Sequence, residues 1–436
     1  MKITKWALTA AIAATCFGTQ AFAKDPAQTQ SQVYSYYAQQ SAPANSGSVD
    51  RASYSDVIPT ACACEELTNC VSRSPFSLIS SDRGGYAVTR AEEAAARCDE
   101  PWRLLQNPVL GFDVGGWSQI GYHTYDNTLF NRHADRVRLH QQWMYAEKVA
   151  DGSSGLGLGG RIDYLYGVDA QDTQAFGPGN NSWDNSWDNG IYGHSIPQLY
   201  MEAAYGDLSV KVGHFFTLVG YESVAATGNF FYSHSYSMYN SEPRTHTGML
   251  AAYKAGEYTT LYGGYVMGWD SGFEDNGDAY LGGYSVELTD NVNFTNQTMF
   301  GRFGNDEVGF MTSAVLTTRV NDAFTHVLWA DYLDTDGTGR TVERQTFDIN
   351  NYFLYRLTDR ATWGNRLEWY NIDKGVYGVT NGRSDVYAYT TGLNYAIGSN
   401  LLVRPEVRWD WDKDGVVGNE LGASQTTFGT DMVFTF

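Results

Sequence analysis

The stretch "LLVRPEVRWDW" at residues 401–411 alternates without interruption between two kinds of side chain. One set is apolar and ends in two tryptophans: Val403, Pro405, Val407, Trp409 and Trp411. The intervening set is charged: Arg404, Glu406, Arg408 and Asp410. Successive side chains of a β-strand point to opposite faces, so a period of two predicts a strand with one apolar and one charged face. What lies on each side of this strand decides the fold.

The same period recurs from residue 111 to residue 436. It predicts sixteen strands, at about 111–122, 133–148, 156–169, 197–205, 208–216, 246–254, 258–268, 279–288, 292–302, 310–319, 323–333, 345–357, 361–372, 384–396, 400–411 and 425–436. Most of them have about ten residues or more, which is the length that a tilted strand needs to cross a bilayer.

The connections between these strands alternate in length. Short turns lie near 150–155, 206–207, 255–257, 289–291, 320–322, 357–360 and 397–399, and the connections between them are mostly longer, the longest being 217–245. An even number of strands, with short turns at one end and long loops at the other, is the plan of bacterial outer-membrane barrels. The sequence therefore predicts an all-β fold, a transmembrane antiparallel up-and-down β-barrel of about 16 strands. The alternative is a secreted soluble β-rich binding protein, in which the charged face would meet solvent.

In such a barrel, the apolar side of 401–411 faces lipid and the charged side faces a water-filled lumen, where charges avoid burial in hydrocarbon. Trp409 and Trp411 then belong to an aromatic girdle at the membrane surface. Pro405 has no amide hydrogen for the strand ladder, and we expect a bulge there.

The composition and the N-terminus indicate an exported protein. The formal net charge of −20 at pH 7 argues against a nucleic-acid partner and is typical of a solvated surface or of an opening that attracts cations. Residues 1–23 have the positive end, apolar core and A-x-A site of a signal peptide. We expect its removal between Ala23 and Lys24 and a location in the bacterial outer membrane.

Two further segments precede the barrel. Residues 24–58 are rich in Gln, Ser, Tyr and Ala and predict a disordered linker. Residues 59–110 form a cysteine-containing segment, which we place in the periplasm, with Cys62, Cys64, Cys70 and Cys98. An even number of cysteines in an exported chain favours two disulfides, and the spacing is a poor zinc pattern. The pairing stays open.

The last strand, "QTTFGTDMVFTF", places aromatic and apolar side chains on one face and ends in Phe436. A terminal aromatic residue on an alternating strand is similar to the signal that barrel-assembly machinery reads. We therefore expect this machinery, together with outer-membrane lipid, as a partner.

From residue 110 onward, the chain resembles the beta-barrel porin-2 (OmpL-like) family. The likeness rests on "VKVGHFFTLVGYE" (210–222), "GNFFYSHSYSMYNSEPRTHTG" (228–248), "GRIDYLYGVD" (160–169) and "NRLEWY" (365–370). The resemblance implies an outer-membrane porin-like barrel and fixes no solute. By analogy with general porins, a homotrimer is expected.

The connection 217–245 is the candidate constriction. In general porins, the loop that folds into the pore also follows the fifth strand, and so long a loop usually has a function. This loop carries Glu222, His234, Glu242 and Arg244 among many aromatic residues. We expect its aromatic residues to pack against the wall and its charges to line the gap. The alternative is an external lid or packing loop.

Alternation assigns charged wall residues to the lumen. They are Arg136, Arg138, Arg161, Asp163, Glu202, Lys211, Arg366, Glu368, Arg404, Glu406 and Arg408. Basic groups outnumber acidic ones in this set although the chain is acidic, and the charges could instead be salt-bridged struts that stiffen the wall. If Glu222 and Glu242 face the arginines across the gap, a transverse field results, and the pore sorts solutes by dipole and size.

The remaining motifs are weaker. Asp410, Asp412 and Asp414 approach a calcium loop, but Leu421 stands where the bidentate Glu belongs, so no cofactor is expected beyond a weak calcium candidate. His234 lies between Ser233 and Ser235, but no third orienting group is identifiable. We therefore predict no enzyme activity, but a channel for passive diffusion of small hydrophilic solutes or ions. The alternative is a non-conducting structural or enzymatic barrel.

Overall fold

The computed structural model describes residues 102–126, 130–175, 183–274, 277–304, 307–337, 343–375, 383–414 and 424–436. The signal peptide, the linker and the four cysteines expected in disulfides lie outside these residues. The predictions made for them stay predictions.

The described chain is almost entirely β-structure. Its strands are β1 (Asp113–His123), β2 (Arg138–Lys148), β3 (Gly157–Gly167), β4 (Asp188–Asn189), β5 (Tyr192–Ser195), β6 (Leu199–Tyr205), β7 (Leu208–Phe216), β8 (Thr245–Lys254), β9 (Thr259–Val266), β10 (Asp278–Thr289), β11 (Val292–Gly304), β12 (Glu307–Asn321), β13 (Phe324–Gly337), β14 (Arg344–Thr358), β15 (Ala361–Lys374), β16 (Ser384–Ile397), β17 (Leu401–Asp412) and β18 (Ser424–Thr435). The helices are short: α4 (Ala170–Thr173), the 3-10 turn η2 (Ala226–Gly228) and α5 (Tyr236–Asn240). Among the described residues, no helix is long and apolar enough to span a membrane.

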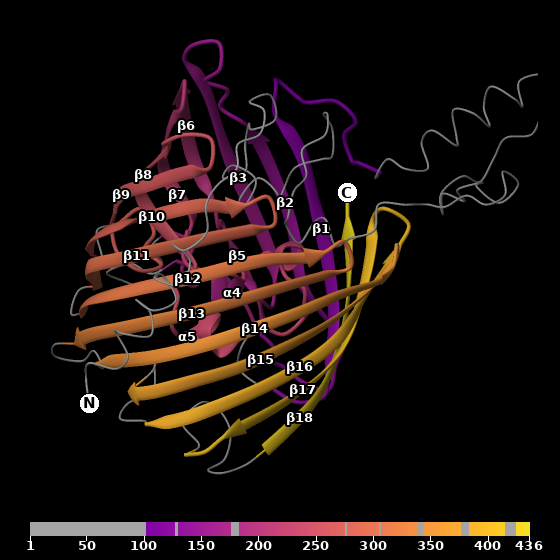
Figure 1. Cartoon of the computed structure of the whole chain (residues 1–436). Helices are drawn as coiled ribbons and strands as arrows, with labels where there is room; N and C mark the ends of the chain where they lie inside the picture. Colours follow the sequence, from indigo (N-terminus) through magenta and orange to yellow (C-terminus); the bar gives the residue numbers. More distant parts are fainter. Residues whose placement is uncertain are drawn as a thin grey trace, which may run out of the picture.

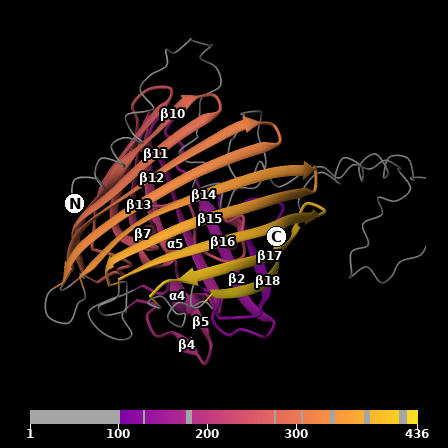
Figure 2. The same ribbon diagram turned by 60° about the horizontal axis from the view of Figure 1, so that its bottom comes forward.

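Each barrel strand pairs antiparallel with its neighbours, and β1 pairs with β18 to close the sheet. The short β4–β5 hairpin belongs to the connection between β3 and β6, so the barrel itself has 16 strands, as predicted. Figure 1 shows the inclined strands β10–β18 forming one wall, with β1–β3 behind it. Figure 2 shows β4, β5 and α4 gathered at one end of the barrel.

The sixteen predicted strands are all present, and their ends agree with the sequence prediction to within a few residues. The largest difference is at β2, which begins at Arg138 rather than at residue 133. His133 and Asp135 have positive φ angles of 72° and 62°, a conformation that interrupts an extended strand.

The two faces of β17 differ as the alternation predicts. Trp409 and Trp411 are 42% and 43% exposed on the outer surface, whereas Arg404 and Arg408 are 2% and 0% exposed on the inner side. The indoles stack on tyrosines of β16, with Trp409 at 5.4 Å from Tyr389 between ring centroids. The expected bulge at Pro405 is wrong. The register between β16 and β17 is the same on both sides of Pro405, and this residue pairs with Thr430 of β18 without a shift.

The chain enters the barrel at the end that carries the short turns. The Trp102 amide donates to Asn400 Oδ1 at 2.7 Å in the β16–β17 turn, and Asn400 Nδ2 donates back to the Trp102 carbonyl at 2.7 Å. The opposite end carries the long connections, and one of these folds into the lumen.

Candidate functional site: the constriction loop

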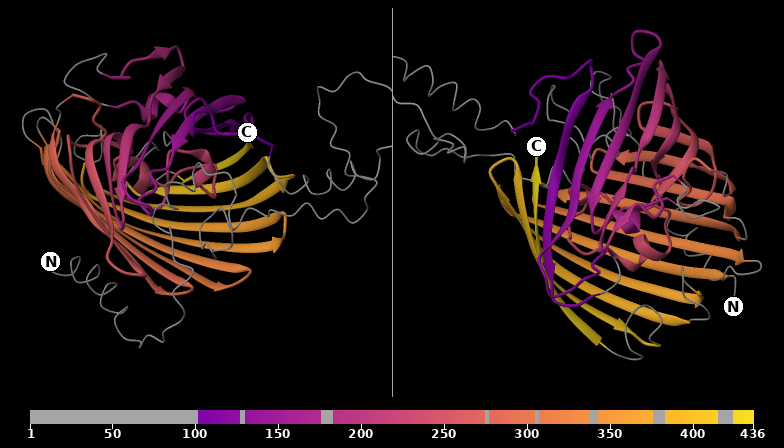
Figure 3. Two further views of the ribbon diagram at one scale, coloured as in Figure 1. Left: turned by 90° about the horizontal axis from the view of Figure 1, so that it is seen from above. Right: turned by 180° about the vertical axis from the view of Figure 1, so that it is seen from behind.

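Residues 217–244 join β7 to β8 and fold into the barrel; we call this segment the constriction loop. Figure 3 shows the chain that follows β7, with α5, inside the ring of strands, between β1–β3 and the wall made by β10–β18. Most of its side chains are buried, although the segment has little regular structure. Its position in the lumen is therefore maintained by contacts with the wall.

Apolar side chains attach the constriction loop to both halves of the barrel. One buried cluster joins loop residues Phe230, Phe231 and Met238 to wall residues Trp117, Trp143, Val327, Trp329, Leu354 and Val433. A second cluster joins loop residues Leu218 and Val219 to Leu250, Val266, Leu281, Met299, Met311 and Leu333. Apolar burial contributes about 25 cal/mol per Å², so these clusters stabilise the docked position of the loop in the lumen.

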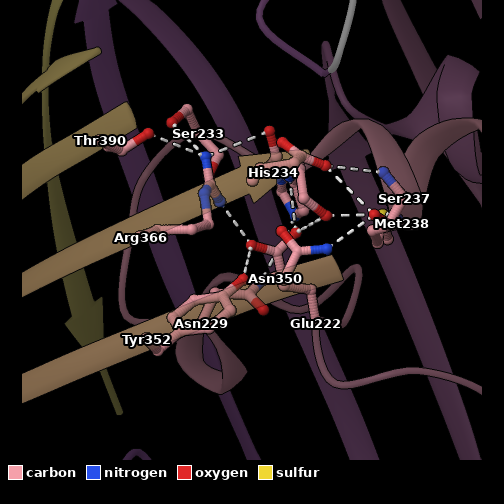
Figure 4. Close-up of polar contacts among 12 residues, drawn as sticks. Glu222, Asn229, Ser233, His234, Ser237, Met238, Asn350, Tyr352, Arg366 and Thr390 are labelled. Atoms are coloured by element: carbon pink, nitrogen blue, oxygen red, sulfur yellow. Dashed lines mark hydrogen bonds and ion pairs between the residues drawn. The ribbon is translucent and has the colours of Figure 1, made fainter. Parts of the chain in front are cut away.

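A buried ion pair links the loop to β15 (Figure 4). Arg366 Nη1 donates to Glu222 Oε1 at 2.5 Å and to the Ser233 carbonyl at 2.8 Å. Tyr352 donates its hydroxyl to the same carboxylate oxygen at 2.7 Å. The other oxygen accepts the Ser235 amide at 2.7 Å. Burial is the strongest influence on Glu222 and would raise its pKa. The positive charge of Arg366, together with His234 and the hydrogen bonds from Ser235 and Tyr352, outweighs burial and lowers this pKa below its usual value. Glu222 is therefore a paired carboxylate.

Two arginines of β17 fix the loop backbone. Arg404 forms an ion pair with Asp431 of β18, with Nη2 and Oδ2 at 2.5 Å, and its Nη1 donates to the carbonyls of Ala226 and Asn229 at 2.9 and 2.7 Å. Arg408 donates to Asp410 at 2.7 Å and to the His234 carbonyl at 2.5 Å. Each guanidinium therefore joins an acidic wall residue to a carbonyl of the constriction loop.

Carboxylates of the wall complete these contacts by accepting loop amides. Glu406 accepts the N–H groups of Tyr232 and Ser233 at 2.9 and 3.1 Å. Glu368 accepts both the amide and the hydroxyl of Ser237, each at 3.1 Å. A loop without a regular ladder has its backbone groups satisfied in this way by alternate charged residues on β15 and β17.

Other long connections meet the constriction loop at α5. Tyr239 donates its hydroxyl to Asp172 at 2.9 Å, and Arg132 pairs with the same carboxylate at 2.7 Å. Arg244 pairs with Asp270 of the β9–β10 connection at 3.2 Å and lies over the Tyr239 ring, 4.8 Å from its centroid. These contacts tie the loop to three neighbouring connections at the long-loop end of the barrel.

Comparison with known proteins identifies the family to which this barrel belongs. The model of the family described as "Putative beta-barrel porin-2, OmpL-like" matches residues 111–436. The chain belongs to this family. The resemblance drawn from the sequence motifs is thereby confirmed, and the barrel is a porin-like barrel of the bacterial outer membrane.

Solved structures of other outer-membrane proteins are similar to this porin-2 barrel in fold. One is OmpT of Vibrio cholerae in a trimer form, with a TM-score of 0.52 and 10% identity over 74% of this chain and 99% of that chain. Another is an anion-selective porin from Comamonas acidovorans, with a TM-score of 0.51 and 10% identity over 74% and 99% of the two chains. No curated protein matches the sequence significantly.

The other predicted lumen residues of the porin-2 barrel lie away from the constriction loop. Arg136 precedes β2 and is exposed, and Arg138 is the first residue of that strand. Arg161 pairs with Asp163 at 2.7 Å and with Glu147 at 3.0 Å. Two residues remain from the predicted set. Glu202 is buried opposite Lys211, whose Nζ lies 4.6 Å from the Tyr200 ring centroid.

The structure does not show the open gap between Glu222 and the arginines from which a transverse field was expected. Glu222 touches Arg366 directly. Glu242 instead lies beside two acidic residues of the wall, Asp331 and Asp348. His234, the remaining loop candidate, packs its ring on Phe130 at 4.6 Å between centroids.

Several wall residues that contact or surround the loop were not predicted from the sequence. Asp331, Asp348 and Asp431 occupy inward positions on β13, β14 and β18, and each alternates with apolar neighbours. Extending the inward and outward assignment from β17 through every strand register would have found them. A buried chain that runs from Asp169 through His140 to Tyr232 was not predictable, because it joins three segments.

The residues considered for metal or catalysis have other partners. Asp410 accepts from Arg408 and from Tyr236, and Asp412 accepts the Ser384 hydroxyl at 2.6 Å. Within the described ranges, no group of three or more His, Cys, Asp or Glu side chains is arranged to hold a metal ion. Ser235 donates its hydroxyl to Glu222.

Proposed function

We propose that this porin-2 family barrel is an outer-membrane channel for passive diffusion of small hydrophilic solutes or ions, without catalytic turnover. The observation that carries the proposal is the constriction loop, a 28-residue connection held inside a closed 16-strand barrel. A channel of this kind sieves by the space that the loop leaves beside the wall. A homotrimer and two disulfides remain part of the proposal, and no cofactor is included in it.

The solute path is proposed along the side of the lumen where inward polar residues keep partial exposure. These are Lys211 on β7, Ser285 on β10, Thr295 on β11 and Thr317 on β12. Ser285 and Thr295 lie side by side, with their hydroxyl oxygens 3.3 Å apart. All four positions lie toward the short-turn end of their strands. The inward residues of β15 and β17 are instead buried under the loop and contribute less surface to a path.

Planar-bilayer recording of the refolded barrel tests the proposal. We expect discrete conductance steps, with a smaller unit step than in a variant whose constriction loop is shortened. A barrel that stays silent in both forms and only links envelope layers would favour a structural role. A silent barrel that hydrolyses phospholipid would favour an enzyme.

Assembly provides a separate prediction at Phe436. Its amide donates to the Gly116 carbonyl at 2.9 Å, and the Gly116 amide donates to the Phe436 carbonyl at 2.9 Å, so it closes the β1–β18 seam. We propose that its ring is also read by the assembly machinery. Phe436→Ala keeps both backbone bonds, and we expect most of the protein to be lost from the outer membrane, as measured by heat-modifiable gel migration.

The matched control is Phe434→Ala, which removes an outward aromatic ring that is 40% exposed two residues earlier. Normal membrane levels of this control are expected. Equal loss in both variants would assign the effect to lipid contact in general and contradict a specific role for Phe436.

A further inference from the structure

Three carboxyl groups from separate elements meet where the constriction loop returns to the wall. Glu242 lies near the end of the loop, Asp331 on β13 and Asp348 on β14, and they are 2%, 1% and 0% exposed. Each has one buried carboxyl oxygen that receives no N–H or hydroxyl donor from the described residues. Such a cluster is costly if every member is ionised, because buried like charges repel and lack solvation.

The geometry shows how this cost is avoided. Asp331 lies opposite Asp348 in the β13–β14 register, and Ser241, next to Glu242, contacts Thr346 on β14 through its hydroxyl at 2.8 Å. The carboxyl group of Glu242 is thereby brought beside that of Asp331, close enough for the two to share a hydrogen bond. Two carboxylates have no hydrogen between them, so this contact requires a proton on one of the two. Burial raises the pKa of Glu242 well above its usual value, and the neighbouring charge of Asp331 raises it further.

Gly220 closes one side of the Glu242 carboxyl group. It lies at the start of the loop, and a Cβ at Gly220 would be 2.1 Å from Glu242 Oε1. Gly220 also has a φ of 93°, which strongly favours glycine. Movement of the loop away from β13 and β14 would separate Glu242 from Asp331 and Asp348 and relieve their repulsion.

Among the described residues, no positively charged side chain near Glu242 is positioned to neutralise its carboxylate in place of the shared proton. Within the loop, Glu222 is held by Arg366, and Arg244 pairs with Asp270 of the β9–β10 connection. On the wall, Arg344 pairs with Glu307 at 2.8 Å. Asp348 of β14 adds a further acidic group, as does Glu368 of β15, which accepts from Ser237. The arginines nearby are thus engaged with other carboxylates, and the remaining groups facing Glu242 are acidic.

We propose that a proton shared by Glu242 and Asp331 latches the end of the constriction loop to β13, and that loss of this proton releases the loop and widens the lumen. The docked loop binds the proton more tightly than a released loop, in which Glu242 has its ordinary pKa. Docking is therefore complete at pH values below the ordinary carboxyl range. It weakens as the pH rises through the raised pKa of Glu242, so the loop opens toward alkaline pH. The effect on conductance rests on the proposed channel function.

Two measurements on the refolded full-length protein test the latch: deuterium uptake of residues 236–244 and single-channel conductance, both followed from acidic to alkaline pH. We expect both to rise with pH in the unmodified chain. In Glu242→Gln and in Asp331→Asn, an amide donates to the remaining carboxylate and no shared proton is needed, so both rises should be lost while the loop stays protected.

One control variant guards against a general effect of substitution, and heat-modifiable migration confirms that the barrel of each variant is closed. Glu343→Gln, at an exposed residue paired with Lys374, should keep the full pH response. A pH-dependent uptake without any conductance would contradict the channel but support the latch. Two results would overturn the latch. One is deuterium uptake that does not change with pH in the unmodified chain. The other is uptake that rises with pH in both amide variants as much as it does in the unmodified chain.

Discussion

Glu222→Ala is expected to free the first half of the constriction loop and to increase the unit conductance of the channel. The substitution leaves Arg366, which is fully buried, without its carboxylate. It also removes the acceptor of the Tyr352 hydroxyl and of the Ser235 amide. Breaking one partner of a buried ion pair typically costs about 3–5 kcal/mol. We expect a loss of this size in loop docking, measured as greater deuterium uptake in residues 220–235 and a larger conductance step.

A double variant tests whether the loss of docking in Glu222→Ala comes from the unpaired charge of Arg366 or from the missing side-chain contact. In Glu222→Gln combined with Arg366→Met, both buried charges are absent, and replacement of a whole ion pair by groups of similar volume is often nearly neutral. Most of the docking should therefore return. An exposed pair provides the control: Glu343→Ala breaks the contact of that residue with Lys374, where both side chains are at least 40% exposed, and should change neither readout. Equal conductance in Glu222→Ala and the unmodified barrel would show that the constriction lies elsewhere.

Arg404→Ala is expected to destabilise both the barrel wall and the loop. The guanidinium bridges β17 to β18 through Asp431, and it is also the donor to two loop carbonyls, at Ala226 and Asn229. Its loss leaves a carboxylate that is 1% exposed with the amide of Gln119 as its remaining donor. The expected cost is again about 3–5 kcal/mol, visible as a lower temperature for the shift to the unfolded gel band.

Arg302→Ala is the matched control for Arg404→Ala. Arg302 also pairs with an aspartate on a neighbouring strand, Asp278, but both side chains are substantially exposed. Solvent screens such a pair and takes over its hydrogen bonds, so the gel transition should not move measurably. If the two arginine variants behaved alike, the stabilising role of burial and of the loop carbonyls at Arg404 would be refuted.

The sixteen strands could be predicted because alternation is a local property. Side chains of an extended backbone point to opposite sides whatever the chain later contacts, so "LLVRPEVRWDW" already separates Trp409 from Arg408. The alternation of short and long connections then indicates an even number of strands. It also places the first and last strand ends together, at the end of the barrel that carries the short turns. Failures occurred where local backbone choices dominate: His133 and Asp135 shorten β2, and Pro405 fits its strand without a bulge.

By itself, the sequence determined the barrel, the inner side of the charged residues on β15 and β17, and the loop that enters the lumen. Only the tertiary structure decided what the inward charges meet. Alternation shows only the side of the sheet on which a side chain lies. A side chain on the inner side can contact water, a loop or the opposite wall. Arg366 and Glu222 are separated by 144 residues, and Arg408 and the His234 carbonyl by 174. These contacts depend on how the loop folds across the closed barrel, which no local pattern encodes.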